Sequence, residues 1–266
     1  DALAPLPDGL HIGLCGTGSP LPDPDRAGPC TFIRAGKRLF LVDVGGGAVR
    51  QLGEMGVQIG QIDGIFLTHF HSDHFDGLSE AMLLRWTGGG HATPLPVYGG
   101  AGVERIVDGL NMAYALDADY RVAHHGADIV PPSGKGGRAV SLALETNTDQ
   151  AVVYEGEGLQ VTAIRVKHDP VAPAFGYLFD YKGRSALISG DTAYTPVLAK
   201  ACNGCDLLVH EALNPEMVAK IGGALKKRGN KRLAKIMSDI PGYHASPVEA
   251  ARTAHDGKAK MLVLTH

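Results

Sequence analysis

Short apolar runs alternate with amphipathic stretches along most of the 266-residue chain. Apolar or alternating runs of this length predict buried strands, and apolar residues repeating every three or four positions predict helices. In the first half, strands are predicted at 9–15, 31–35, 38–44, 64–68 and 95–98, and helices at 48–55, 78–86 and 103–114.

The second half repeats this style. Strands are predicted at 152–155, 159–166, 176–181, 185–189, 207–209 and 261–264, with helical turns over 215–240. A last helix begins at Ser246, because Ser at the N-cap, Pro247 at the first helical position and Glu249 at the third form a capping box.

Residues 124–150 contain PPSGKGG and show little periodicity, so they are either a mobile loop or a plain connection. Strand-rich stretches followed by helices, twice over, indicate two packed sheets with helices outside. We therefore expect one domain over 1–266, with two similar halves at roughly 1–123 and 151–266 joined by a loop-rich segment.

The composition excludes two classes of protein. With 44% apolar and 20% charged residues the chain can form a core, so it is not disordered. No apolar run approaches the ~20 residues that span a bilayer, so no membrane is expected. A net charge of −3 disfavours nucleic acid as an extensive partner, although 226–232 holds five cations that are either a solvated helix face or a contact for nucleic acid.

Four cysteines are too few for a disulfide scaffold in a chain of this size. Cys202 and Cys205 form a CxxC, but no second pair completes a zinc ribbon, so partly buried thiols or one local disulfide are favoured over a zinc or redox pair. Because the chain begins at Asp1 rather than Met, we expect a trimmed N-terminus, which slightly favours export over a cytoplasmic location.

The segment THFHSDHFDGL at 68–78 comes directly after an apolar strand and directly before a helical pattern. Imidazole nitrogens and carboxylate oxygens are ligands that Zn²⁺ accepts. At such a corner, His69 and His71 can face one site while Asp73 and His74 face a neighbouring one. Asp76 is either a residue that supports these ligands or a cap for the helix.

Further ligands are needed to complete two metal sites. His168, Asp191 and His266 each follow the end of a predicted strand, where loops cluster and sites are built. Taken singly each would be structural, but together with the first motif they form a ligand set.

In this order, THFHSDHFDGL, His168, SGDT, LLVHEA and LVLTH resemble the metallo-β-lactamase superfamily. The resemblance implies an α/β fold, an αββα sandwich of two mixed β-sheets with helices on the outer faces, and a site with two Zn²⁺ per chain. It assigns His69, His71 and His168 to one zinc ion and Asp73, His74 and His266 to the other, with Asp191 bridging them.

GTGSP near the start, His210-Glu211, and Tyr-His-Ala-Ser at 243–246 are similar to the branch that contains tRNase Z and certain arylsulfatases and phosphodiesterases. That branch implies a metal-bridged hydroxide oriented by Asp73, and a catalytic pair in which Glu211 orients His244 and His244 protonates the leaving oxygen. Otherwise His244 is simply a residue at the entry of the last helix. The family also implies a homodimer.

The sequence departs from tRNase Z in two ways. Only the segment 169–190 separates His168 from Asp191, which leaves no room for the tRNA-gripping arm, whereas the insertion between Glu211 and His244 resembles arylsulfatase-like members. The chain also stops at His266, where the family continues, so we expect truncation.

These departures rank the functions. Zinc-dependent hydrolysis of small anionic esters, either an aryl sulfate or a phosphodiester, is expected first, and tRNA 3′-end processing second. β-Lactam hydrolysis is weakened by Asp191, because the best-known lactamase branches carry Cys or Ser there. A metal-binding module without turnover is disfavoured by the complete ligand set and by the Glu211 and His244 pair.

Overall fold

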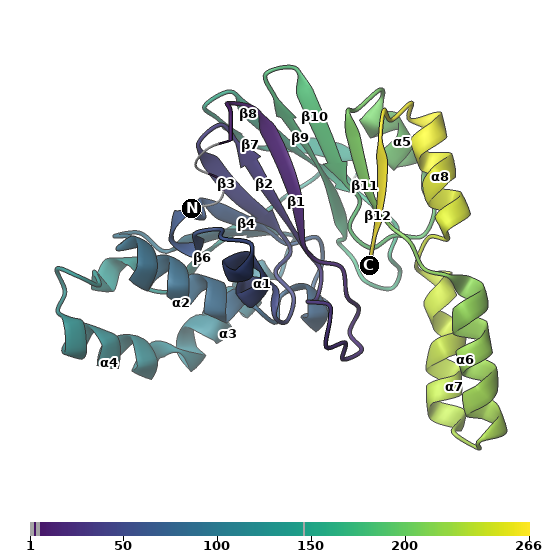
Figure 1. Cartoon of the computed structure of the whole chain (residues 1–266), viewed down its shortest axis with the longest axis horizontal. Helices are drawn as coiled ribbons and strands as arrows, with labels where there is room; N and C mark the ends of the chain where they lie inside the picture. Colours follow the sequence, from purple (N-terminus) through teal and green to yellow (C-terminus); the bar gives the residue numbers. More distant parts are fainter. Residues whose placement is uncertain (1–2, 4–5, 146) are drawn as a thin grey trace. The chain divides into compact units, whose positions relative to one another are not determined.

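The structure, a computed structural model, describes residues 3, 6–145 and 147–266. It divides into two compact units, Asp1–Glu145 and Thr146–His266, here called the N-terminal and C-terminal units. Each unit contains one mixed six-stranded sheet and the helices that pack on it (Figure 1). The two mixed sheets with helices confirm the predicted α/β class.

The N-terminal sheet has the strand order β1-β2-β3-β4-β5-β6. β1, β2 and β3 pair antiparallel, and β3 to β6 pair parallel. The strands are β1 (Leu10–Gly16), β2 (Cys30–Ala35), β3 (Arg38–Val42), β4 (Gly64–Phe66), β5 (Leu95–Gly99) and β6 (Gly137–Ser141). β6 lies in the segment interpreted as a loop, because a half-exposed edge strand carries no long apolar run.

Apolar residues of this sheet pack against α1, α2 and α3 in a core that includes Leu41, Val97, Leu52, Met82 and Val107. The helices are α1 (Ala48–Glu54), α2 (Leu78–Gly89), α3 (Val103–Ala113) and α4 (Ala115–His125), with short 3₁₀ helices at Ile59–Gln61, Ser72–His74 and Pro132–Gly134. α4 was not predicted, and Ala118 is its only residue that the structure describes as buried.

The C-terminal sheet has the order β12-β11-β10-β9-β8-β7, antiparallel from β7 to β10 and parallel from β10 to β12. Its strands are β7 (Gln150–Gly156), β8 (Leu159–Arg165), β9 (Phe175–Tyr181), β10 (Arg184–Ile188), β11 (Leu207–Glu211) and β12 (Leu262–Thr265). The predicted ranges match all six of these strands and differ from them only at the strand ends.

α5 (Pro196–Cys202) and α8 (Pro247–Asp256) pack together on this sheet, over a core that includes Ile164, Leu187 and Leu198. α8 begins with the predicted capping box between Ser246 and Glu249. α5 is too short for its periodicity to be recognised. α6 (Pro215–Lys227) and α7 (Lys231–Asp239) form a hairpin that extends away from the sheet of this unit, followed by a 3₁₀ helix at Ile240–Gly242 (Figure 1).

All four cysteines are paired. Cys15 and Cys30 join β1 to β2, and Cys202 and Cys205 form a local disulfide at the end of α5. Within the described ranges, no helix combines the length and the apolar character needed to cross a bilayer.

Candidate metal centre

The histidine motif of the N-terminal unit occupies the corner between β4 and α2. β3 and β4 run parallel, so the segments that follow them leave the sheet at the same edge. Asp43 follows β3, and the motif follows β4 through the 3₁₀ helix Ser72–His74. Sheet topology therefore brings the motif next to the carboxylate of Asp43, which lies 25 or more positions earlier in the chain.

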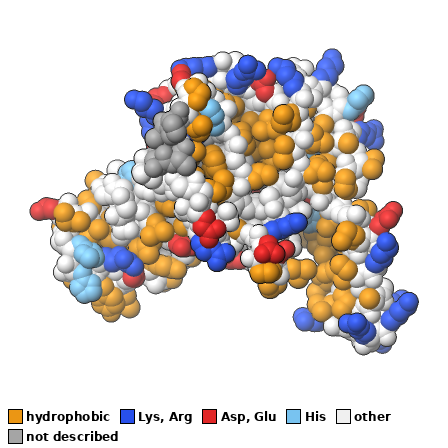
Figure 2. Space-filling model, viewed as in Figure 1, with side chains coloured by type: hydrophobic (Ala, Val, Ile, Leu, Met, Phe, Trp, Pro, Cys, Tyr) orange, Lys and Arg blue, Asp and Glu red, His pale blue; other side chains and the backbone are white. Residues whose placement is uncertain are grey.

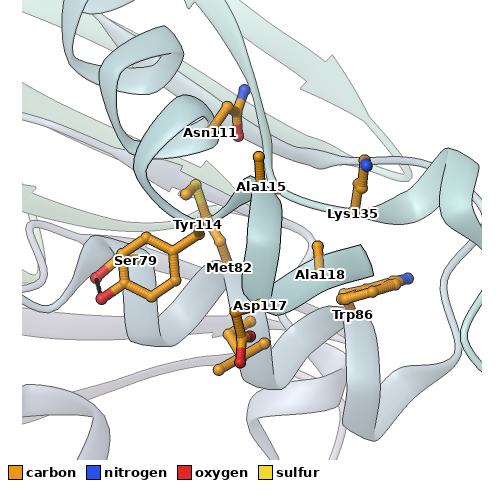
Figure 3. Close-up of a pocket in the computed structure, with 11 residues that line it drawn as sticks. Ser79, Met82, Trp86, Asn111, Tyr114, Ala115, Asp117, Ala118 and Lys135 are labelled. Atoms are coloured by element: carbon orange, nitrogen blue, oxygen red, sulfur yellow. Dashed lines mark hydrogen bonds between the residues drawn. The ribbon is translucent and has the colours of Figure 1, made fainter. Parts of the chain in front are cut away.

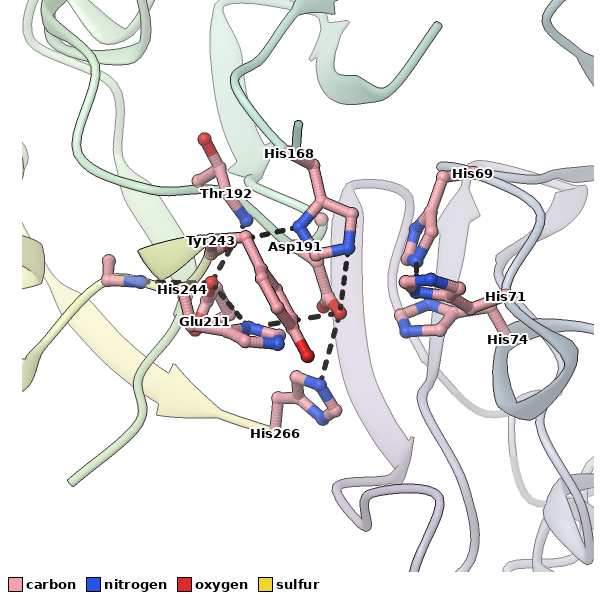
Figure 4. A network of polar contacts seen from close by, with 12 residues as sticks. His69, His71, His74, His168, Asp191, Thr192, Glu211, Tyr243, His244 and His266 are labelled. Carbon is pink, nitrogen blue, oxygen red and sulfur yellow. Dashed lines mark hydrogen bonds and ion pairs between the residues drawn. The ribbon is translucent and has the colours of Figure 1, made fainter. Parts of the chain in front are cut away.

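The motif side chains form a compact group of ligand atoms (Figure 4). His69 Nε2 lies 2.9 Å from His71 Nδ1, and the rings of His69 and His74 have centroids 4.1 Å apart. Asp73 Oδ2 is 3.8 Å from His74 Nε2. His69 and His74 are almost fully buried, so these basic nitrogens converge away from water, a donor set that suits a divalent cation.

Asp43 supports this group and was missed by the sequence analysis. Its Oδ1 accepts from the Thr68 amide at 2.8 Å, and its Oδ2 accepts from Thr68 Oγ1 at 2.8 Å. Oδ2 also lies 2.7 Å from His74 Nδ1. A carboxylate on one ring nitrogen orients the other nitrogen toward a metal. The available signal was an acid directly after an apolar strand, in LVDVGG.

Asp76 does not cap α2 in the structure. Its side chain makes no hydrogen bond among the described residues, and α2, which begins at Leu78, has Gly77 at its N-cap and no side-chain cap. Partial burial and the nearby Asp73 carboxylate raise the pKa of Asp76.

The C-terminal unit gathers a second group at the carboxyl ends of its strands. β8, β10, β11 and β12 point the same way, because β8 and β10 are both antiparallel to β9 and the last three are parallel. The residues at or just beyond these ends are His168, Asp191, Glu211 and His266.

Asp191 is the centre of this group. Its Oδ2 lies 3.2 Å from His266 Nε2 and 4.0 Å from His168 Nε2. His168 Nδ1 donates to the carbonyl oxygen of Tyr243 at 2.9 Å, which leaves Nε2 as the basic nitrogen that can bind a metal. The ligand atoms of Asp191, His244 and His266 all lie within 4.8 Å of one another.

Glu211 and His244, which are 33 positions apart, are in contact in the same unit (Figure 4). Glu211 Oε1 accepts from His244 Nδ1 at 3.0 Å, from the Thr192 amide at 2.9 Å and from the Ala245 amide at 3.1 Å. Burial raises the pKa of Glu211, while the hydrogen bond from His244 opposes that rise. The arrangement fixes the His244 ring with its Nε2 directed away from Glu211.

Tyr243 is a further side chain of this group that the sequence marked only as part of a motif. Its ring lies 4.9 Å from that of His244 and 5.3 Å from that of His168, measured between centroids. Burial and nearby carboxylates raise the pKa of Tyr243, so its hydroxyl stays protonated.

A separate cavity of about 190 Å³ lies in the N-terminal unit among α2, α3 and α4 (Figure 3). Met82, Trp86 and Ala118 line it. Its polar side chains are paired: Ser79 donates to Tyr114, and Trp86 Nε1 donates to the carbonyl of Pro131. Because these side chains are already hydrogen-bonded, the cavity offers no set of catalytic side chains.

Residues 38–266 match the family described as a beta-lactamase superfamily domain, so the chain belongs to the metallo-β-lactamase superfamily. Within it, the chain belongs to the tRNase Z-like branch. It is 35% identical over 259 residues to ribonuclease Z of Mycobacterium marinum, covering 97% of this chain and 86% of the relative. It is 33% identical over 260 residues to ribonuclease Z of Mycobacterium tuberculosis H37Rv, covering 97% and 85%.

Solved structures agree with this assignment. The short form of human tRNase Z matches with a TM-score of 0.71 and 25% identity, over 96% of this chain and 92% of the human chain. A diphosphatase of the PhnP family matches with a TM-score of 0.63 and 19% identity, over 97% and 87% of the two chains, and shows the fold alone. These likenesses confirm the predicted αββα fold.

The relatives overturn one prediction. The sequence analysis named a small anionic ester as the partner and disfavoured nucleic acid, yet the relatives are named ribonuclease Z. That prediction was wrong because it relied on the missing room for an arm between His168 and Asp191 and on the net charge of −3, which averages a local basic cluster with the acidic remainder. Specific nucleic-acid contacts depend on where the cations lie.

Proposed function

We propose that this protein is a zinc-dependent endonuclease that hydrolyses a phosphodiester bond at the 3′ side of precursor tRNA. The observation that carries the proposal is 33–35% identity to proteins named ribonuclease Z over 97% of the chain. The paired Glu211 and His244 support it, because an RNA ester has a poor leaving group that needs a proton.

Two zinc ions per chain are part of the proposal. The ligands would be His69, His71, Asp73 and His74 from the N-terminal unit and His168, Asp191 and His266 from the C-terminal unit. The converging nitrogen and carboxylate atoms in each unit suit zinc. Bound zinc supplies Lewis acidity, which activates water and neutralises charge that develops on phosphate oxygens.

The protein's own groups have distinct tasks in this proposal. Asp73 orients the attacking water through its carboxylate. Glu211 holds His244 through Nδ1, so that His244 Nε2 carries the proton given to the leaving 3′ oxygen. His168 is held in one tautomer by the Tyr243 carbonyl, which keeps His168 Nε2 unprotonated for a metal.

The decisive experiment incubates zinc-reconstituted protein with a precursor tRNA carrying a 3′ trailer, with and without chelator. A bis-aryl phosphodiester, an aryl sulfate and a chromogenic cephalosporin are tested in parallel. We expect cleavage at a single position of the precursor, abolished by chelator and restored by zinc. Turnover of the sulfate or the cephalosporin without any cleavage of precursor tRNA would refute the proposal.

A further inference from the structure

The α6–α7 hairpin of the C-terminal unit carries a concentrated positive charge. Its free end holds five cations within seven positions and no acid: Lys226, Lys227, Arg228, Lys231 and Arg232. All five side chains are exposed, and none has an ion-pair partner among the described residues. In Figure 2, Lys and Arg side chains surround the end of the hairpin at the lower right. The whole chain has a net charge of −3, so this cluster stands out against an acidic remainder.

The end of the hairpin is a formed structure. Gly229 adopts φ +77° in the turn, and Asn230 caps α7 by accepting from the Leu233 amide at 3.1 Å. A β-carbon at Gly222 would lie 3.2 Å from Cβ of Met237, so this glycine lets the two helices approach closely. The five cations are therefore displayed on a defined surface.

The base of the hairpin is attached to the proposed acid pair. α6 starts four residues after Glu211, with Asn214 as its N-cap, and the chain that leaves α7 reaches His244 through the 3₁₀ helix Ile240–Gly242. The Leu213 amide donates to the Ala245 carbonyl at 2.8 Å and ties the two ends together. The 13 residues of α6 reach about 20 Å at ~1.5 Å per residue.

We propose that the free end of this hairpin binds the phosphate backbone of the RNA substrate, at about 20 Å along α6 from the Glu211 and His244 pair. This inference rests on the proposed function for the identity of the polyanion. Unpaired cations on a protruding element attract a phosphate backbone and release its counterions. Such contacts position the RNA without reading its sequence.

An alternative use of the hairpin is contact with a second copy of the chain, because Met217, Ile221 and Ile236 expose apolar surface along it. The charge favours RNA. A second copy would present the same five cations, and the repulsion between like charges opposes association at this end.

The test compares Lys226→Gln/Lys227→Gln/Arg228→Gln with two matched variants. Lys37→Gln/Lys200→Gln/Lys258→Gln removes three exposed cations elsewhere, and Lys226→Arg/Lys227→Arg/Arg228→Lys keeps the charge of the hairpin. Binding of precursor tRNA is measured as a function of salt with chelator present, so that no cleavage is needed. KM and kcat are then measured with zinc, on the precursor and on a bis-aryl phosphodiester.

We expect the hairpin Gln variant to weaken RNA binding roughly 10-fold or more and to reduce the slope of log K against log salt by up to about 2–3. KM for the precursor should rise with kcat and diester turnover unchanged, and both matched variants should behave as the parent. Precursor cleavage with an unchanged KM and salt slope would overturn this inference and leave the proposed function standing.

Three further outcomes separate the claims. Salt-sensitive RNA binding that requires the hairpin, in a protein that cleaves no precursor, would refute the proposed function and uphold the hairpin contact. A Gln variant that converts a dimer to a monomer in light scattering, with unchanged RNA affinity, would show a self-interface and overturn the inference. Equal loss of diester turnover in the Gln and charge-conserving variants would also overturn it, because the effect would then be structural.

Discussion

The two buried carboxylates of the C-terminal unit have different surroundings. Three donors converge on one oxygen of Glu211, and its other oxygen, Oε2, has no hydrogen-bond partner among the described residues. Asp191 instead faces the imidazole nitrogens of His266 and His168. A carboxylate surrounded by donors fixes a neighbour's orientation, whereas one surrounded by basic nitrogens suits a cation.

His244→Ala should separate the acid from the metal ligands. If His244 Nε2 protonates the leaving oxygen, the variant should keep its zinc and lose roughly 10²–10⁴-fold in turnover. The loss should be largest for poor leaving groups and small for nitrophenolate, which departs without a proton. Zinc content and a leaving-group series measure both effects.

His266→Ala is the control, since a lost metal ligand should lower zinc content and slow all substrates alike. A His244→Ala protein that loses zinc, or that slows every leaving group equally, would show that His244 is a ligand or a structural residue.

At the scale of elements, the two ends of the parallel strands β10 to β12 have different tasks. The candidate ligands lie at the carboxyl ends, while Asp206 joins the opposite ends. Asp206 Oδ1 accepts from Lys260 Nζ at 2.8 Å, just before β12, and Asp206 Oδ2 accepts from the Ser185 amide at 3.0 Å in β10. These bonds, with a further one from Arg184, lower the pKa of Asp206 to about 2.

Asp206→Asn should therefore destabilise the protein in a pH-dependent way. The pKa of Asp206 in the folded state is below its ordinary value of 3.8. The contribution of the Asp206 carboxylate to the free energy of unfolding is therefore complete above pH 3.8 and is lost as pH falls through about 2. Because the Asp206 side chain is partly exposed, we expect Asp206→Asn to lower the free energy of unfolding by about 1 kcal/mol at neutral pH. Urea unfolding at pH 7, 4 and 3 measures the difference from the parent, which should shrink at the lowest pH.

Asp256→Asn removes an exposed carboxylate that pairs with Arg252 at 3.6 Å, and should cost little at any pH. A loss for Asp206→Asn that is the same at every pH would show that packing, rather than charge, is responsible.

For the whole molecule, the candidate ligands are divided between the two units, with His69, His71, Asp73 and His74 in one and His168, Asp191 and His266 in the other. Among the described residues, each unit contributes part of the ligand set proposed for two zinc ions. Metal binding and the stability of the whole chain should therefore be linked.

Removal of zinc should lower the melting temperature of the intact chain, because a metal that binds only the folded state adds its binding free energy to stability. At a free zinc concentration 100 times the Kd, the gain is about 2.7 kcal/mol per site. Calorimetry with and without chelator measures this gain in stability. Titration with zinc should then restore the original melting temperature at two zinc ions per chain. His69→Ala should show a smaller response to zinc, and an identical response would contradict the ligand assignment.

The sequence by itself determined most of the strands, the HxHxDH corner at 69–74 and the capping box of α8, because each depends on residues within a few positions of one another. It did not reveal β6 and α5, which are short, or α4, which buries only Ala118 among its described residues. It suggested the pairing of Glu211 with His244 only through a resemblance.

The tertiary structure decided which distant groups meet. Asp43 contacts His74 across 31 positions, since β3 and β4 lie side by side and end at one edge of the sheet. It also placed the five cations of 226–232 at the free end of one hairpin, where the sequence had left open a solvated helix face or a contact for nucleic acid. Local patterns specify local conformation, but strand order and register decide which side chains share a site, because those depend on packing between segments far apart in the chain.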